Sequence, residues 1–326
     1  MPDNAKTQCL IGVDLGGTKI LAGVFDTAFN CLGQVKISTK AHRGPDEVIN
    51  RIARCVKDTV DECDLSMSQV RGVGIGAPGA VDTQEGRVIF APNLGWENLP
   101  LKKSLEKLLD VPVFVENDCK LHTLGVFEAE LKAKPKHLIG IFLGTGVGAG
   151  IIIDGKPYTG INGTAGEVGH MVIDINGPEC GCGNKGCFEA LASRRAIFRN
   201  IQSAVKKGQK TLLTDMLGDD LADLRSGDLR KAIRRGDKFV EKVIDQAAEY
   251  TGIAVGNLMN IFNPEVIVIG GGVVEQLEHE MLPIIEKVAR KQALPGTSKG
   301  VQIVATRLGD DAGITGGAVL VMRQTK

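Results

Sequence analysis

Aromatic residues and net charge are scarce in this chain. Only thirteen of its 326 residues are aromatic, and 39 lysines and arginines balance 39 aspartates and glutamates. A chain without net charge has no general electrostatic attraction to nucleic acid or to an anionic membrane surface. The low aromatic content, together with forty-two glycines, indicates a fold built on tight turns and close backbone approaches, as in nucleotide-binding α/β proteins.

Long apolar runs are also missing. No stretch approaches the roughly 20 apolar residues that span a membrane, and the first ten residues contain no apolar signal core. Five cysteines are scattered along the chain, at Cys9, Cys31, Cys55, Cys63 and Cys119, which fits free thiols in a reducing compartment. We therefore expect a cytoplasmic protein without membrane or nucleic-acid partners, long enough for two domains with separate cores.

The other three cysteines form the most specific pattern in the sequence. Cys180, Cys182 and Cys187 fall within eight positions, and His170 precedes them. Four thiolate and imidazole ligands close a tetrahedral structural zinc site, and the glycines between the cysteines let so short a loop wrap around one ion. Such a site has no open position for water, so the zinc would organise the loop. A disulfide pair or buried free thiols are the alternatives.

Two carboxylates flank this cluster. Glu167 lies just before His170, and Glu189 follows Cys187 by two positions. Acceptors held rigidly by a metal-bound loop suit a ligand with several hydroxyl donors, because little ordering is then required on binding. The alternative is that both are ordinary surface charges, the usual place of glutamate.

An internal repeat divides the chain. Residues 10–26 align without a gap on residues 138–154, and each copy runs from an apolar strand through a Gly-Thr bend to a second apolar strand. Helices are predicted at residues 45–63, 101–109, 118–131, 190–206, 238–261 and 277–291, and further strands at 72–77, 111–115, 266–269 and 301–305. The order predicts an α/β protein with two duplicated β-sheet domains around a central cleft.

Both bends are candidates for phosphate binding. Absent side chains allow backbone N–H groups and a threonine hydroxyl to approach phosphate oxygens, and neither bend has the Gly-Lys-Ser/Thr ending of a Walker loop. The first copy has an acid, Asp14, where the second has Phe142, which suits one acid near Mg²⁺ and the transferring phosphate. Two purely structural hairpin turns are the alternative.

Two strand ends carry further candidates. An apolar strand delivers Glu116, Asn117 and Asp118 directly into a predicted helix; helix capping could explain one of them but not all three. A carboxylate there is placed to accept a hydroxyl proton while the oxygen attacks phosphorus. A second strand ends in three glycines, Gly270, Gly271 and Gly272, where an adenine or ribose could lie against backbone.

Together these motifs resemble the ROK family of sugar kinases, within the superfamily of sugar kinases, heat-shock ATPases and actin. The resemblance covers essentially the whole chain, and Glu-Val-Gly-His with Cys-Gly-Cys-Gly-x-x-Gly-Cys is its most specific part. It implies the two-domain, actin-like (ribonuclease H-like) ATPase fold. The smaller domain would comprise residues 1–118 and 306–326, and the larger one residues 119–305 with the zinc site.

The resemblance also implies residue roles. Asp118 would be the catalytic base that takes the proton of a sugar 6-hydroxyl. His170 would use one ring nitrogen for zinc and the other for the sugar. The implied sugar contacts are Gly79, Asn93, Asn117, Asp118, Glu167, His170 and Glu189. The implied nucleotide contacts are Asp14, Gly16, Gly17, Thr18 and Lys19, then Gly144, Thr145 and Gly146, and finally Gly270, Gly271 and Gly272.

One departure follows the base. The family usually continues with small residues, whereas this chain has the segment from Cys119 to His122, on the helix behind Asp118, where we expect it to alter packing more than chemistry. The resemblance implies an ATP-dependent hexokinase with Mg²⁺ and structural Zn²⁺ that converts glucose to glucose 6-phosphate, as a homodimer or homotetramer.

The alternatives are a kinase for N-acetylglucosamine or N-acetylmannosamine and a ROK-type sugar-sensing regulator without kinase activity. Such regulators carry an N-terminal helix-turn-helix domain and generally lose the phosphate motif. Here the first strand begins near Cys9 and the motif is intact, which favours the kinase.

Overall fold

The computed structural model describes residues 8–325 and contains two compact units. The first comprises the described residues up to Lys136 with Gly150–Gly166 and the segment from Asp310, and the second comprises His137–Ala149 and Glu167–Gly309. The boundary expected at Asp118 differs from this division. Helix α3 (Asp118–Gly125) stays with the first unit because it packs against the C-terminal helix α11 (Asp311–Gln324).

The first unit is built on a five-stranded sheet with the order β3-β2-β1-β4-β8. Its strands are β1 (Cys9–Leu15), β2 (Lys19–Phe25), β3 (Cys31–Ser38), β4 (Val70–Ala77) and β8 (Val113–Asn117). β2 runs antiparallel to β1 and to β3, whereas β1, β4 and β8 are parallel. The predicted first hairpin, β1 with β2, is confirmed.

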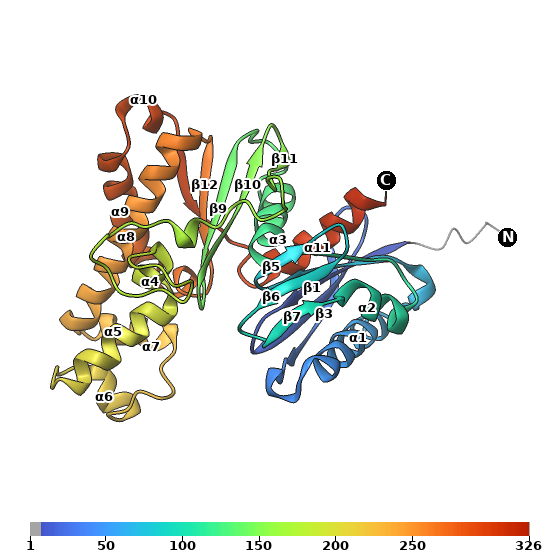
Figure 1. Cartoon of the computed structure of the whole chain (residues 1–326), viewed down its shortest axis with the longest axis horizontal. Helices are drawn as coiled ribbons and strands as arrows, with labels where there is room; N and C mark the ends of the chain where they lie inside the picture. Colours follow the sequence, from blue (N-terminus) through green and yellow to red (C-terminus); the bar gives the residue numbers. More distant parts are fainter. Residues whose placement is uncertain (1–7, 326) are drawn as a thin grey trace. The chain divides into compact units, whose positions relative to one another are not determined.

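Both faces of this sheet are covered. Cys9 and Ile11 of β1 belong to the core shared with α1 (Pro45–Asp61) and α2 (Leu101–Leu109), whereas the intervening Leu10 packs with Ile314 of α11. Because alternate side chains of a strand point to opposite faces, both sets must be apolar, and residues 9–13 of β1 form a continuous apolar run that ends before Asp14. Figure 1 shows α11, in red, beside the blue strands from the other end of the chain.

Helix α11 approaches the sheet and α3 so closely that only glycine fits. A Cβ on Gly12 or Gly74 would collide with the backbone of Ile314 or Gly317, and a Cβ on Gly316 would collide with the carbonyl oxygen of Leu121 in α3. Because the atoms in contact belong to the backbone, no rotation of a side chain could relieve these collisions.

Replacing Gly316 with alanine should lower the free energy of unfolding by about 3 kcal/mol, because the added methyl group forces α11 away from α3. Urea denaturation of the purified variant measures this change. Gly296→Ala is the matched control, since its Cβ would meet nothing within 4 Å. An unchanged midpoint for Gly316→Ala would contradict the close contact.

Smaller elements complete the first unit. They are a three-stranded antiparallel sheet of β5 (Ala80–Asp82), β6 (Arg87–Ala91) and β7 (Trp96–Leu99), two 3₁₀ turns at Ala41–Arg43 and Met67–Gln69, and a π-helical turn at Val126–Glu130. The helix predicted at residues 118–131 is thus α3 followed by a π turn. The small sheet and β3 were not predicted, because their strands are short or largely exposed.

The second unit repeats the plan of the first. Its sheet has the order β11-β10-β9-β12-β13, with β9 (Leu138–Leu143), β10 (Val147–Ile153), β11 (Lys156–Pro157), β12 (Val266–Gly270) and β13 (Gln302–Ala305). β9, β12 and β13 are parallel, and β10 passes from the second unit into the first after Ala149. The succession β10-β9-β12-β13 corresponds to β2-β1-β4-β8, so the predicted duplication is confirmed.

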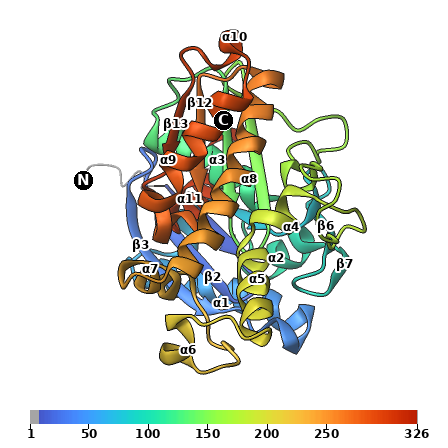
Figure 2. The same ribbon diagram turned by 90° about the vertical axis from the view of Figure 1, so that its left-hand side faces the viewer.

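Figure 2 shows the helices of the second unit, the two longest of which lie in front of its sheet. The helices of this unit are α4 (Phe188–Ala192), α5 (Arg194–Lys206), α6 (Leu212–Leu217), α7 (Ser226–Arg234), α8 (Lys238–Phe262), α9 (Val274–Gln292) and α10 (Pro295–Ser298). The single helix predicted at residues 190–206 divides at Ser193, whose hydroxyl accepts the N–H of Ala196 (3.2 Å) and caps α5. Among residues 8–325, no helix has both the length and the apolar character needed to cross a membrane.

Candidate functional site

The strand end that was expected to carry the base is the junction between β8 and α3. Asn117 ends β8 and caps α3: its Oδ1 accepts the N–H of Lys120 (3.2 Å), and its Nδ2 donates to the carbonyl of Gly79 (3.0 Å). Asp118 opens α3, and its Oδ1 accepts the N–H of Cys119 (2.8 Å). The fold therefore brings Gly79, Asn117 and Asp118 together and orients the Asp118 carboxylate.

Three titratable groups lie close together around this point. Burial raises the pKa of Asp118 above its ordinary value, the nearby His122 lowers it, and the charge of Asp14 raises it further. His122 Nε2 lies 3.6 Å from Asp14 Oδ1. Burial lowers the pKa of His122, but the carboxylates of Asp14, Asp118 and Asp310 outweigh burial and raise it. The carboxylates therefore face a basic group.

The position of His122 differs from what the sequence led us to expect. It lies on α3 beside Asp14, where Gly313 of α11 provides the space: a Cβ on Gly313 would lie 2.7 Å from His122 Nε2 and 2.9 Å from Asp14 Cγ. Its role is thus electrostatic as well as steric. The spacing of four residues after Asp118 could have indicated this, since residues i and i+4 share one helix face.

The first bend, between β1 and β2, is held by backbone contacts. Gly16 N–H donates to the Lys19 carbonyl (2.9 Å), and Thr39 bonds to the bend twice, donating its hydroxyl to Gly16 (2.7 Å) and its N–H to Thr18 (2.9 Å). The Lys19 ammonium forms an ion pair with Asp310 (2.5 Å). This lysine, predicted to contact phosphate, thereby ties the bend to the start of α11.

Asn93, a predicted sugar contact, lies beside the same bend. A Cβ on Gly17 would be 3.7 Å from the Asn93 carbonyl oxygen and 3.8 Å from its Cβ. Gly79 adopts a positive φ of 86°, and a Cβ there would collide with the Phe90 carbonyl oxygen. Glycine is therefore required at this position. The predicted residues of the first unit thus gather around one bend and one strand end.

The second bend and the three-glycine turn lie next to each other. They follow β9 and β12, which are parallel neighbours with Gly270 opposite Phe142. Gly271, at φ 90°, has space only for hydrogen over the backbone of Leu143, and Val273 N–H donates to the Leu143 carbonyl (3.2 Å). Ligands of open α/β sheets bind beyond the carboxyl ends of parallel strands, so this edge is a candidate ligand site.

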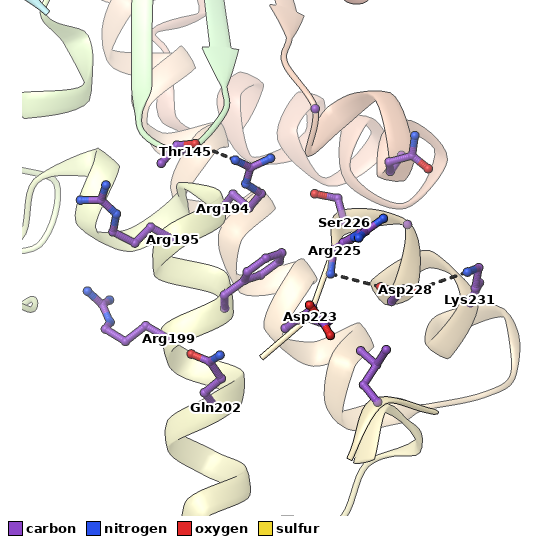
Figure 3. Close-up of a pocket in the computed structure, with 16 residues that line it drawn as sticks. Thr145, Arg194, Arg195, Arg199, Gln202, Asp223, Arg225, Ser226, Asp228 and Lys231 are labelled. Atoms are coloured by element: carbon purple, nitrogen blue, oxygen red, sulfur yellow. Dashed lines mark hydrogen bonds and ion pairs between the residues drawn. The ribbon is translucent and has the colours of Figure 1, made fainter. Parts of the chain in front are cut away.

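A pocket of about 1130 Å³ opens at this edge (Figure 3). Its lining comes from both glycine turns and from α5, α6, α7 and α9, and includes Thr145, Arg194, Arg195, Phe198, Arg199, Arg225, Ser226, Lys231, Gly272 and Gln276. The lining includes five cationic side chains and two carboxylates, those of Asp223 and Asp228, and Asp228 forms an ion pair with Lys231 (3.2 Å). The Ser226 hydroxyl is buried and has no hydrogen-bond partner among the described residues. The pocket has the size and charge for an anionic ligand.

Glu189 contacts the second bend. Its Oε2 accepts the N–H of Val147 (2.9 Å) and lies against Gly146, where any Cβ would collide with it. Glu167 is exposed and precedes the 3₁₀ turn Val168–His170. The carboxylate of Glu189, positioned by α4, is thus connected to the bend as well as to the cysteine loop.

The cysteine loop brings its four predicted ligands together. The ligand atoms of His170, Cys180, Cys182 and Cys187 all lie within 4.8 Å of one another. Cys182 Sγ and Cys187 Sγ are 3.7 Å apart, as are Cys180 Sγ and His170 Nδ1. Tetrahedral zinc separates two thiolates by about 3.8 Å, whereas a disulfide joins sulfurs at about 2.0 Å. The donor set and its spacing fit one metal ion.

The backbone of the loop is adapted to this cluster. A Cβ on Gly186, at φ 70°, would collide with the Asp174 carbonyl oxygen, and the Ile173 N–H donates to the Gly186 carbonyl (2.8 Å). The Phe188 N–H donates to the Met171 carbonyl (2.9 Å). These bonds tie the segment after His170 to the start of α4.

Comparison with known proteins identifies relatives along almost the whole chain. The sequence profile of the ROK family matches residues 10–324. A glucokinase from Thermotoga maritima is 36% identical over 314 residues, 96% of each chain. The crystal structure of a ROK family glucokinase from Streptomyces griseus in complex with glucose and AMPPNP superimposes with a TM-score of 0.85 at 33% identity, covering 97% of this chain and 99% of that one.

Regulators are similar as well. A xylose repressor from Bacillus spizizenii is 31% identical over 323 residues, and the match covers 98% of this chain and 78% of the repressor. The architecture is that of the actin-like ATPase fold of sugar kinases. Since the family profile extends over nearly the entire sequence, the chain belongs to the ROK family.

Proposed function

We propose that this protein is an ATP-dependent hexose kinase that converts glucose to glucose 6-phosphate. The observation that carries the proposal is Asp118, an oriented carboxylate of raised pKa at the end of β8, beside the bend that contains Asp14. Similarity to glucokinases over almost the whole chain supports it. A carboxylate of this kind suits removal of a proton from a hydroxyl group.

In this proposal Asp118 is the general base. Its carboxylate accepts the proton of the sugar 6-hydroxyl as that oxygen attacks the terminal phosphorus of the donor, and the bond from this phosphorus to the leaving ADP oxygen breaks. The N–H of Cys119 keeps the carboxylate oriented before the sugar arrives. Asn117, held by Gly79, would contact the sugar next to the base.

The pocket beyond β9 and β12 is assigned to the donor nucleotide. Thr145 of the second bend and Gly272 of the three-glycine turn both line it, so phosphates and adenosine would be held by adjacent turns. The bend with Asp14, Gly16, Gly17 and Thr18 is the second proposed phosphate contact. Mg²⁺, when bound with the nucleotide, would neutralise charge on the phosphates.

The cysteine loop is assigned to one structural zinc ion. His170, Cys180, Cys182 and Cys187 would hold it, and all four positions would be protein ligands. The ion would fix the segment between Glu167 and Glu189, which we propose as sugar contacts together with His170 and Asn93. Glu189 Oε2 already accepts the Val147 N–H, which leaves Oε1 to accept a sugar hydroxyl.

Parallel phosphorylation assays test the proposal. With Mg-ATP, we expect kcat/KM for glucose to exceed the values for N-acetylglucosamine, N-acetylmannosamine, mannose and fructose. Preference for an acetamido sugar would retain the mechanism and replace the substrate, since a pocket that accepts a 2-acetamido group differs by a few side chains. Sugar binding without turnover on any substrate would contradict kinase activity and favour a sensor related to the xylose repressors.

A further inference from the structure

Arg194, the first residue of α5, holds the second bend by two contacts. Its backbone N–H donates to the carbonyl of Gly144 (3.0 Å), and its Nη2 donates to the hydroxyl oxygen of Thr145 (2.6 Å). Figure 3 shows the guanidinium reaching Thr145 across the edge of the pocket. Neither the internal repeat nor the family resemblance indicated this residue.

The contact determines which way the Thr145 hydroxyl can donate. A guanidinium has only donors, so the threonine oxygen must accept from Arg194 and its own hydrogen remains for a different acceptor. The bend has already placed that hydroxyl in the pocket lining. An incoming phosphate oxygen is the kind of acceptor that would complete the arrangement.

The guanidinium is itself available to an anion. Arg194 lines the pocket and is half-buried, with one of its five N–H donors on Thr145. Arginine matches phosphate geometry with paired N–H groups. Its position on a helix that begins at the bend limits the entropy lost on binding.

We infer that Arg194 binds the phosphate chain of the donor directly and also orients the Thr145 hydroxyl toward it. The inference rests on the proposed function, because it takes the pocket to be the donor site. It adds a specificity-determining cation to a bend that otherwise offers only backbone N–H groups and one hydroxyl. The ligand class is a nucleoside triphosphate, recognised here through its phosphates.

Calorimetric titration with ATP and with adenosine tests this inference. For Arg194→Gln we expect the Kd for ATP to rise about 10- to 100-fold, the loss of a charge-assisted hydrogen bond, while the Kd for adenosine and the KM for glucose stay unchanged. Arg194→Lys should recover part of the loss. Arg234→Gln, an exposed residue outside the pocket lining, is the control for lost charge.

A double-mutant cycle with Thr145→Val separates the two roles. If Arg194 touches phosphate, Arg194→Gln still weakens ATP binding when Thr145 is already valine. No further loss in that background would mean that Arg194 acts only through Thr145 and would overturn the direct contact. If Arg194→Gln weakened the binding of ATP and of adenosine equally, or lowered the melting temperature enough to explain both losses of affinity, Arg194 would have a structural role. Either result would overturn the inference.

The outcome also distinguishes this inference from the proposed function. Wild-type protein that binds ATP through Arg194 yet phosphorylates no sugar would retain the inference and reject the kinase. Active wild-type protein whose ATP affinity is insensitive to Arg194→Gln would retain the kinase and reject the inference. Failure of wild-type protein to bind ATP would reject both.

Discussion

Asp118→Asn should lower kcat by about 100- to 10,000-fold, the usual contribution of a general base, while the Kd for glucose changes little. Asparagine keeps the size of the side chain and can still accept the Cys119 N–H, but it cannot take a proton. Steady-state assays and glucose titration of the same preparation measure the two quantities. Near-normal turnover would eliminate Asp118 as the base.

Thermal unfolding provides the control for this variant. Burial raises the pKa of Asp118, so its ionised form is less favourable in the folded than in the unfolded protein. The contribution of Asp118 to the free energy of unfolding is therefore fully present at pH values below its pKa in the unfolded chain. It is lost as the pH rises through its higher pKa in the folded protein. At neutral pH asparagine removes this cost, and Asp118→Asn should unfold at the same temperature as the wild type or higher.

The same assignment determines the acid limb of the wild-type pH profile. A base works only when deprotonated, so kcat/KM falls as pH drops through the pKa of Asp118. Because that pKa is raised from 3.8, the fall should occur at higher pH than for an ordinary aspartate. A fall of kcat/KM at the pH expected for an ordinary aspartate would contradict the conclusion that burial raises the pKa of Asp118.

Cys182→Ser should remove the bound metal and raise the KM for glucose about 10-fold or more. The serine hydroxyl is a poor substitute for thiolate, and loss of one of four ligands opens a closed zinc site. Without the ion, only backbone hydrogen bonds such as that from Ile173 to Gly186 would hold the cysteine loop against the segment after His170. The proposed sugar contacts Glu167 and Glu189 would then be less firmly positioned. Metal analysis and glucose kinetics measure both effects.

Wild-type protein should contain about one zinc per chain by this assignment. Cys31→Ser is the matched control, since Cys31 is an exposed free cysteine outside the cluster and its loss should change neither metal content nor KM. A fully active protein without metal would refute a structural zinc. Metal retained by Cys182→Ser would exclude Cys182 as a ligand.

Local signals in the sequence were sufficient for much of the fold. The repeat of residues 10–26 at 138–154 predicted two hairpins, and they recur as β1–β2 and as β9 with β10 in sheets of matching order. Short apolar runs and helical patterns predicted most of the long elements, because both faces of β1 and one face of α1 must be apolar. The strands of the small sheet and the short helices α6 and α10 carried too few residues for a pattern.

The boundary between the two units depended on contacts distant in sequence. The segment after Asp118 looked like the start of the second domain, yet α3 remains with the first unit because Gly125 and Gly316 let α3 and α11 approach within backbone contact. Nothing local to either helix indicates its partner. Such a boundary is a property of packing.

The sequence by itself indicated the cluster of one histidine and three cysteines, the glycine bends and the strand end with Asp118, because each is a short motif recognised by residue type and spacing. Only the tertiary structure decided which charged and polar groups meet: Lys19 pairs with Asp310, His122 lies beside Asp14, and Arg194 donates a hydrogen bond to the Thr145 hydroxyl. Electrostatic and hydrogen-bond energies depend on distances of a few ångströms, and the chain reaches those distances only when segments far apart in sequence pack together.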